Sequence, residues 1–291
     1  MGRLFGTDGV RGVANSELTC EMAMNIGRAA AMVLTDNNHR HPKILIGKDT
    51  RISSDMLESA ITAGLCSVGA NVVQLGVVPT PAVAFLVGKY KADAGVMLTA
   101  SHNPCEFNGI KIFSGDGYKL PDALEEQIEA IVLDHADVPP VPTGGDIGSV
   151  TTAPNVVRDY VDHIKSTVPF ALTGMRIGID CANGAASRVA PELFARLGAR
   201  VVSRACEPDG MNINLDCGST HPEALQALVG RTAPPRKNLF PLPAGLRLRL
   251  RLNCLHLFGG LLVHAGDLLL CILADTGRDP FDSVHRSLLR R

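Results

Sequence analysis

The chain has 291 residues, of which 46% are hydrophobic and 20% are charged, and its formal net charge is -1 at pH 7. This length and composition are typical of a globular protein of about two domains with a sizeable core. The near-zero net charge excludes a global electrostatic field that would attract nucleic acid or an anionic membrane, so we expect neither as a partner.

The sequence carries no targeting or membrane signal that we can identify. The start, MGRLFGTDGV, lacks an apolar core of signal-peptide length, and the leucine-rich stretch 255–274 is interrupted by polar residues, which makes it a poor membrane span. None of the eight cysteines forms a CxxC pair. Scattered cysteines without a secretion signal indicate reduced thiols, so we expect a cytoplasmic protein.

The first half of the chain alternates aliphatic runs with amphipathic ones. In chain order we expect strands at 43–47, 71–76, 94–98 and 109–113, and helices at 56–68, 79–90 and 121–134. Ser53 to Asp55 are the expected N-cap candidates of the first of these helices. Such an alternation predicts right-handed crossovers and a layered α/β domain.

The pattern restarts after a stretch rich in Pro, Gly and Thr, residues 137–153, which we interpret as a connection between domains. After this stretch we expect a helix over 156–168, a strand at 175–180, a helix that ends near Leu197, a strand at 199–203 and a helix that begins at His221. Two similar α/β units in tandem are the interpretation that this repetition favours.

The tail over residues 229–291 has a different composition. Leucine becomes frequent, glutamate is absent after Glu223, and the polar members of LRLRLRL are arginines. We expect this tail to lie outside the fold of the preceding chain, as the product of a reading frame shifted near Val229 or as disordered chain. A true domain of unusual composition is the alternative.

The stretch TASHNP, residues 99–104, follows the expected strand at 94–98. Ligands of open α/β sheets bind beyond the carboxyl ends of strands, where Ser101 would lie. The stretch is not a G-x-S-x-G elbow, so an α/β-hydrolase is unsupported. With Lys111 returned to the loop by an expected turn at Asn108-Gly109, the surroundings of Ser101 suit a phosphoryl group better than an acyl group. A capped turn with no chemical role is the alternative.

Two further stretches could bind phosphate. The glycines of FGTDGVRG, residues 5–12, let the backbone approach a ligand closely, and Arg11 offers a bidentate grip on phosphate. GKDTR, residues 47–51, places Lys48 and Arg51 at the end of another expected strand. The alternatives are an N-terminal turn and a solvated charge cluster.

Taken with NGIKIF, DCANGA and NINLDCGSTHPE, these motifs resemble the α-D-phosphohexomutase superfamily in order and spacing, over about residues 1–228. TASHNP and NGIK are specific to the superfamily, and FGTDGVRG with GSTHPE points to the branch that acts on glucosamine phosphates. The resemblance implies tandem α/β/α layered domains of the phosphohexomutase type, with mixed sheets and helices on both faces. The first domain would span residues 1–140, a linker 141–156, and part of a second domain 157–228.

The resemblance also implies an activity, namely the interconversion of glucosamine 6-phosphate and glucosamine 1-phosphate for UDP-N-acetylglucosamine synthesis. Ser101 would carry a phosphoryl group, donate it to the sugar, and receive the other phosphate back from the bisphosphorylated intermediate. Lys111 would be the general base, Arg11 would assist at the phosphoserine, and His102 would hydrogen-bond the phosphate or a sugar hydroxyl. The expected phosphate- or substrate-binding residues are Thr7, Asp8, Gly9, Lys48, Arg51 and Asn103.

The family further implies Mg²⁺, held by the phosphoserine and by three aspartates of a DGDxDR-type loop soon after GSTHPE. No such loop follows in this sequence, so Ser101 is the only metal ligand that we can assign. The family's third and fourth domains are also missing, and we therefore expect the chain as given to be inactive or nearly so. A non-catalytic remnant that binds a phosphosugar is the alternative. A dinucleotide-binding fold is unsupported, because no G-x-G-x-x-G follows a strand.

Overall fold

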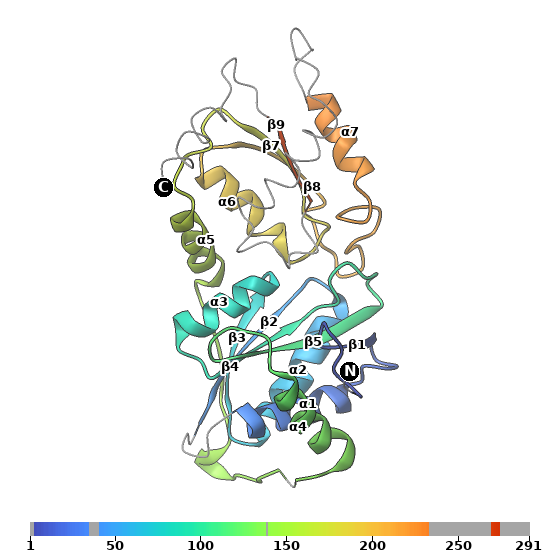
Figure 1. The fold of residues 1–291 in the computed structure, drawn as a ribbon, viewed down its shortest axis with the longest axis vertical. Coiled ribbons are helices and arrows are strands. Elements are labelled where there is room, and N and C mark those ends of the chain that lie inside the picture. The colour runs from blue at the N-terminus through green and yellow to red at the C-terminus, as the bar shows by residue number, and fades with distance from the viewer. Residues whose placement is uncertain (1–2, 35–40, 138, 233–268, 274–291) are drawn as a thin grey trace.

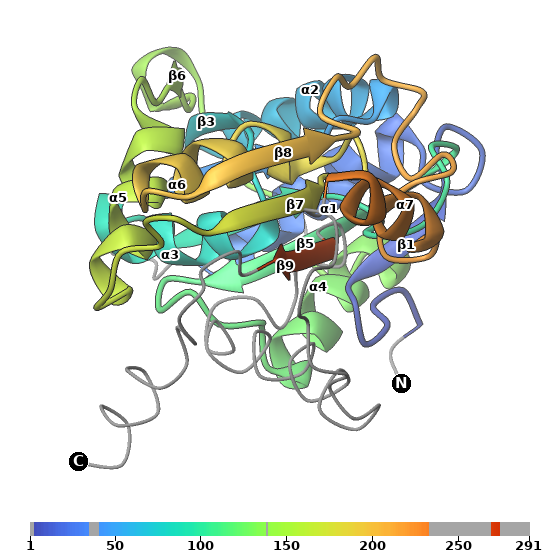
Figure 2. The same ribbon diagram turned by 90° about the horizontal axis from the view of Figure 1, so that it is seen from above.

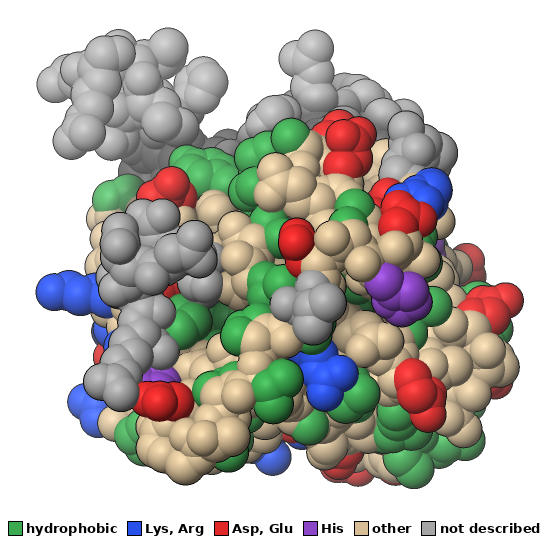
Figure 3. Space-filling model, turned by 90° about the horizontal axis from the view of Figure 1, so that it is seen from below, with side chains coloured by type: hydrophobic (Ala, Val, Ile, Leu, Met, Phe, Trp, Pro, Cys, Tyr) green, Lys and Arg blue, Asp and Glu red, His purple; other side chains and the backbone are tan. Residues whose placement is uncertain are grey.

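The computed structural model describes residues 3–34, 41–137, 139–232 and 269–273. These residues form two α/β units stacked along the long axis of the molecule, domain I below and domain II above in Figure 1. Among the described helices, none is long and apolar enough to cross a membrane. On the face of domain I that Figure 3 shows, acidic and basic side chains are scattered among hydrophobic ones, as a near-zero net charge would predict.

Domain I is built on a mixed six-stranded sheet in the order β1-β5-β4-β2-β3-β6. Its strands are β1 (Val10–Val13), β2 (Lys43–Lys48), β3 (Asn71–Val77), β4 (Ala94–Leu98), β5 (Phe107–Ser114) and β6 (Val150–Thr152). In this sheet β5 runs antiparallel to its neighbours β1 and β4, and the other pairs are parallel. The carboxyl ends of β2 and β4 therefore meet at one edge of the sheet.

Helices cover both faces of this sheet. α1 (Cys20–Leu34), α2 (Ile52–Ser67) and α4 (Asp122–Asp134) lie on one face, and α3 (Thr80–Tyr90) lies on the other. Because side chains alternate along a strand, Ile44 and Ile46 of β2 pack under α1 and α2, whereas Leu45 packs under α3. The two aliphatic layers explain why every residue of β4 is buried.

The expected strands and helices of domain I are confirmed, apart from three differences. The helix expected from residue 56 begins at Ile52, with Arg51 rather than Ser53 to Asp55 as its N-cap residue. The turn expected at Asn108-Gly109 is wrong, because both residues lie inside β5. Part of the stretch expected to link the domains forms β6, which pairs with β3 at the edge of the domain I sheet.

Domain II has a sheet in the order β8-β7-β9. Its strands are β7 (Arg176–Asp180), β8 (Arg200–Arg204) and β9 (Leu269–Leu273), and its helices are α5 (Val156–Thr167), α6 (Ala190–Arg196) and α7 (Glu223–Thr232). β8 is parallel and β9 antiparallel to the central β7. Figure 2 shows this sheet lying over domain I, with α5 and α7 at its opposite ends.

The core of domain II is continuous with the α3 face of domain I. One buried cluster runs from Leu86 of α3 through Val161 of α5 to Ile177 of β7 and Phe194 of α6. The domains therefore share apolar burial, which fixes how the loops of domain II sit against domain I.

Of the tail over residues 229–291, the structure describes the last turn of α7 and the strand β9, whose Leu273 lies opposite Arg176 of β7. The rest of the tail lies outside the described residues. The two expectations for it, a shifted reading frame and disorder, therefore stay predictions.

Candidate functional site

The loop that holds Ser101, residues Thr99–Pro104, turns sharply after β4. Ser101 adopts the left-handed region, with φ 55°, and its N–H donates to Thr99 Oγ1 at 3.0 Å. The N–H of Asn103 donates to the carbonyl of Ala100 at 3.1 Å. Ser101 is half-buried and His102 is exposed. We call residues 99–104 the serine loop.

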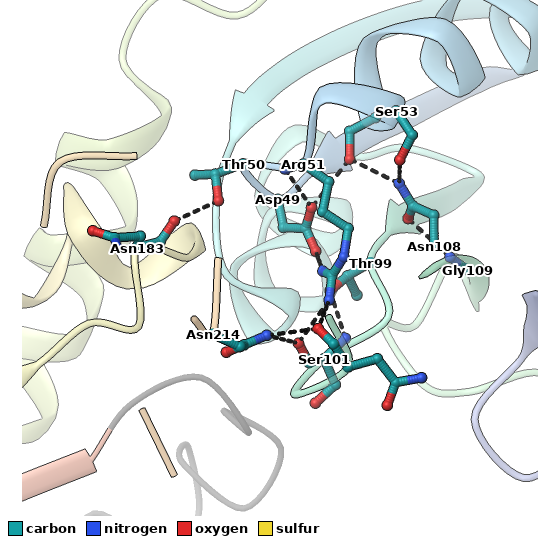
Figure 4. A network of polar contacts seen from close by, with 12 residues as sticks. Asp49, Thr50, Arg51, Ser53, Thr99, Ser101, Asn108, Gly109, Asn183 and Asn214 are labelled. Atoms are coloured by element: carbon teal, nitrogen blue, oxygen red, sulfur yellow. Dashed lines mark hydrogen bonds and ion pairs between the residues drawn. The ribbon is translucent and has the colours of Figure 1, made fainter. Parts of the chain in front are cut away.

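Arg51 holds the serine loop from beneath. Its side chain is 0% exposed and forms an ion pair with the equally buried Asp49. Its Nη2 donates to the carbonyl oxygens of Ser101 at 3.1 Å and Asn103 at 2.6 Å (Figure 4). The cation is thus used to fix two carbonyls of the loop.

In this geometry the guanidinium of Arg51 has no exposed surface to offer a ligand, and its expected role in binding phosphate stays a prediction. Lys48, the other expected phosphate-binding cation of this strand end, contacts two carboxylates, Asp55 at 2.6 Å and Glu58 at 2.5 Å. Burial lowers the pKa of Lys48, but these hydrogen bonds outweigh burial and leave the pKa above its usual value. The Lys48 charge is therefore balanced within domain I.

Asn108, which the sequence predicts only as part of a turn, is a buried residue of the site. Its buried Nδ2 donates to Ser53 Oγ at 2.9 Å and Ser54 Oγ at 3.1 Å, and its Oδ1 accepts from the N–H of Gly109 at 2.8 Å. Ser54 Oγ in turn donates to Asp49 at 3.1 Å. Asn108 therefore ties β5 to the start of α2 and to the ion pair under the serine loop.

Arg11 and Lys111 lie on the neighbouring strands β1 and β5. Arg11 is opposite Gly109, where a Cβ would come within 2.7 Å of the carbonyls of Thr99 and Val10. Glycine is needed there because the strands and the serine loop approach so closely. Arg11 Nη2 lies 3.1 Å from Asp8 Oδ2.

A cavity of about 520 Å³ opens beside these strands. Its lining includes Thr7, Asp8, Gly9 and Lys111 from domain I, and Tyr160 and His163 of α5. The structure thus brings Thr7, Asp8, Gly9 and Lys111 to one cavity. Lys111 lies on β5, the neighbour of β4, and the serine loop follows β4.

Glu129 of α4 anchors the chain just before Thr7. Its carboxylate accepts three backbone N–H groups, from Leu4 and Phe5 at 2.7 Å and from Arg3 at 3.0 Å. Burial raises the pKa of Glu129, but the three N–H groups and the Arg3 charge outweigh burial and hold the pKa below its usual value. No motif in the sequence identifies this anchor.

Domain II contacts both the start of α2 and the serine loop through four hydrogen bonds. Thr50 Oγ1 donates to the carbonyl of Asn183 at 2.5 Å, and the N–H of Ile52 donates to the carbonyl of Gly210 at 2.9 Å. Asn214 Nδ2 donates to the carbonyls of Ser101 and Asn103, both at 2.9 Å. The site is therefore built from both domains.

The described residues do not supply a complete site for a divalent cation. Among them, no three His, Cys, Asp or Glu side chains are grouped so that they could hold a metal ion. Mg²⁺ prefers six oxygen ligands in near-octahedral geometry, and Ser101, through a phosphate, is the one ligand predicted here. Within the described ranges, the residues thus do not fit the Mg²⁺ site that the family implies.

Comparison with known proteins agrees with this architecture. Residues 2–138 match the family described as phosphoglucomutase/phosphomannomutase, alpha/beta/alpha domain I, and residues 158–233 match alpha/beta/alpha domain II of the same family. Solved structures are similar as well. A phosphoglucomutase/phosphomannomutase family protein from Burkholderia thailandensis superposes with a TM-score of 0.65 at 26% identity, over 78% of this chain and 49% of that one. A putative phosphomannomutase from Thermus thermophilus superposes with a TM-score of 0.66 at 27% identity, over 79% of this chain and 52% of that one.

Curated relatives are closer in sequence. The phosphoglucosamine mutase of Acetivibrio thermocellus is 59% identical over 229 residues, and that of Clostridium novyi is 56% identical over 229 residues. Each alignment covers 79% of this chain and 51% of the relative, so the chain spans about half the length of these relatives. The two matched domains confirm the predicted tandem α/β/α fold, and the chain belongs to the phosphoglucomutase/phosphomannomutase family.

Proposed function

We propose that Ser101 is the phosphoryl carrier of a phosphoglucosamine mutase, which interconverts glucosamine 6-phosphate and glucosamine 1-phosphate. The observation that carries this proposal is the serine loop itself. Two of its carbonyls accept hydrogen bonds from a fully buried guanidinium, which leaves Ser101 half-buried in a left-handed turn at the edge of the sheet. The buried ion pair of Arg51 and Asp49 beneath the loop supports this conformation of Ser101. The identity to curated phosphoglucosamine mutases supports the choice of sugar.

In the proposed reaction, the bond between phosphorus and Ser101 Oγ breaks as a sugar hydroxyl oxygen bonds to phosphorus. The hydroxyl proton passes to Lys111 as general base, and the cation of Arg11 balances charge on the transferring group. The other phosphate of the bisphosphorylated sugar then returns to Ser101 Oγ by the reverse sequence. Exposed His102 would donate a hydrogen bond to the phosphate or to a sugar hydroxyl, and Asn103 and the N-terminal residues Thr7, Asp8 and Gly9 would contact the substrate.

Mg²⁺ is the cofactor that family resemblance implies, and it would bind the phosphate on Ser101. Because the described residues do not complete its ligand set, a second candidate function is a remnant that binds a phosphosugar without turnover. We also propose that the protein is cytoplasmic, which the free thiols of Cys20, Cys66, Cys105, Cys181, Cys206 and Cys217 support.

A test starts from the purified chain, mixed with glucosamine 1,6-bisphosphate and Mg²⁺. We expect intact mass to rise by one phosphoryl group and peptide mapping to place this group on Ser101. Ser101→Ala should abolish the gain, and Ser166→Ala, which removes an exposed serine of α5, should not. Conversion of glucosamine 6-phosphate to the 1-phosphate would support the full mutase. A rise in melting temperature without turnover would support the binding remnant. No mass gain and no shift in melting temperature would refute both.

A further inference from the structure

Asn214 contacts the serine loop from domain II, although it lies 113 residues after Ser101 in the chain. The residue stands in the loop between β8 and α7, and it is 8% exposed. Its Nδ2 donates to the carbonyl oxygens of Ser101 and Asn103, each at 2.9 Å (Figure 4). These bonds are largely shielded from water, so water cannot readily replace them.

The same two carbonyls also accept hydrogen bonds from Arg51. A carbonyl oxygen has two lone pairs, so it can accept both donors. The serine loop is thus held by a cation from domain I and by an amide from domain II. The loop needs such support, because Ser101 adopts a left-handed backbone conformation that L-residues other than glycine rarely keep without it.

Asn214 is itself fixed to the sheet of domain II. Its N–H donates to the carbonyl of Ala182 at 2.9 Å, just beyond the end of β7, and its own φ is 61°. A displacement of domain II would therefore move the Asn214 amide away from the serine loop. The Asn214 side chain therefore links the position of domain II to the conformation of Ser101.

We propose that Asn214 is a positioning residue, which makes the reactive conformation of Ser101 depend on the docking of domain II. Asn214 acts through the backbone of the serine loop and does not itself react. The catalytic part of this proposal rests on the proposed function of Ser101, whereas the structural coupling does not.

The test compares Asn214→Gly with Asp216→Gly in the full chain. Both residues have positive φ, 61° and 51°, so glycine keeps the backbone conformation at each position. Asp216 is exposed in the same loop, which makes it the matched control. We expect amide hydrogen exchange of Ser101 and Asn103 to become about tenfold faster in Asn214→Gly, because two buried hydrogen bonds are lost. Exchange in β2 and β7 should not change, and Asp216→Gly should match the wild type.

A second measurement follows phosphoryl uptake by Ser101 from glucosamine 1,6-bisphosphate at several sugar concentrations. We expect the maximal rate to fall about tenfold in Asn214→Gly, in line with the lost hydrogen bonds, while the half-saturating concentration is unchanged. A merely structural role would not separate the two parameters in this way. Loop exchange and maximal rate equal to those of Asp216→Gly would overturn the proposal. If the wild type takes up no phosphoryl group, the proposed function of Ser101 fails, and the exchange experiment alone then decides whether Asn214 couples the domains.

Discussion

Domains I and II bury their sheets in different ways. Domain I covers both faces of six strands with its own helices, and among the largest fully buried side chains, Leu18, Ile26, Ile44 and Leu57 all belong to it. In domain II, β8 is exposed or half-buried along its length, and the buried cluster of α6 and β7 continues into α3 of domain I. Domain I therefore buries most of its sheet by itself, whereas domain II depends on domain I for part of its core.

We expect the largest loss of stability when the buried ion pair of domain I is removed. Arg51→Ala leaves the Asp49 carboxylate buried without its cation and frees two carbonyls of the serine loop. We expect the free energy of unfolding, measured by urea denaturation, to fall by about 4 kcal/mol.

The matched control is Arg196→Ala in domain II. The side chain of Arg196 is 34% exposed and pairs with Asp162 at 2.6 Å, so its loss should cost less than about 1 kcal/mol. Equal losses for the two variants would contradict the view that the serine loop rests on a buried ion pair.

A cavity in domain II tests whether the core is shared. Phe194→Ala removes a ring that is 2% exposed, and we expect it to cost about 3 kcal/mol of unfolding free energy. If the core is continuous, amide exchange should accelerate in α3 as well as in β7. Acceleration confined to domain II would show that the domains unfold separately. Met211→Ala, at a side chain that is 57% exposed, should change stability by less than about 0.5 kcal/mol.

The anchor of the N-terminal segment should have a smaller effect. Glu129→Gln replaces the carboxylate by an amide, whose NH₂ group cannot accept the backbone N–H groups that one carboxylate oxygen accepts. We expect the free energy of unfolding to fall by about 2 kcal/mol. Because the pKa of Glu129 is lowered in the folded chain, the unfolded chain binds the proton first as pH falls. The stabilisation is therefore complete above about 4.3, the ordinary glutamate pKa, and is lost below it. Urea denaturation at several pH values should show a shallower acid slope in the variant; an unchanged slope would refute this role.

The sequence was sufficient to predict the elements that hydrophobic periodicity marks. The aliphatic runs of β2, β3 and β4 and the helices between them are examples. The elements outside the predictions include β1 and α1. β1 has four residues and lies inside a glycine-rich motif. α1 follows Thr19, whose Oγ1 accepts the N–H of Met22 at 3.2 Å, and this N-cap residue was a signal that could have identified the helix.

The sequence predicted which residue types belong to the candidate site, but not which residues their side chains contact. Motif spacing placed Lys48 and Arg51 at the same strand end. Lys48, however, pairs with one exposed and one buried carboxylate, whereas Arg51 is fully buried under the serine loop. Spacing gives no information on which of two nearby cations faces inward, because that depends on how the neighbouring loop packs. The contact of Asn214 with the serine loop could not be predicted for the same reason, because the docking of the two domains brings Asn214 to Ser101.

The smallest predicted effect concerns the boundary between the domains, where His163 of α5 stacks on Phe85 of α3 with ring centroids 3.7 Å apart. Burial and the nearby Lys89 charge lower the pKa of His163 in the folded chain. As pH falls through about 6.5, the ordinary histidine pKa, the unfolded chain therefore binds a proton before the folded chain does, and stability decreases. His163→Phe keeps a stacked ring but removes the titration. We expect it to reduce the dependence of unfolding free energy on pH between about 7 and 5 by less than about 1 kcal/mol, measured by urea denaturation at several pH values. If His163→Phe retains the full dependence, His163 is not the source of the pH response, and the stacked pair contributes to the boundary through ring packing and not through titration.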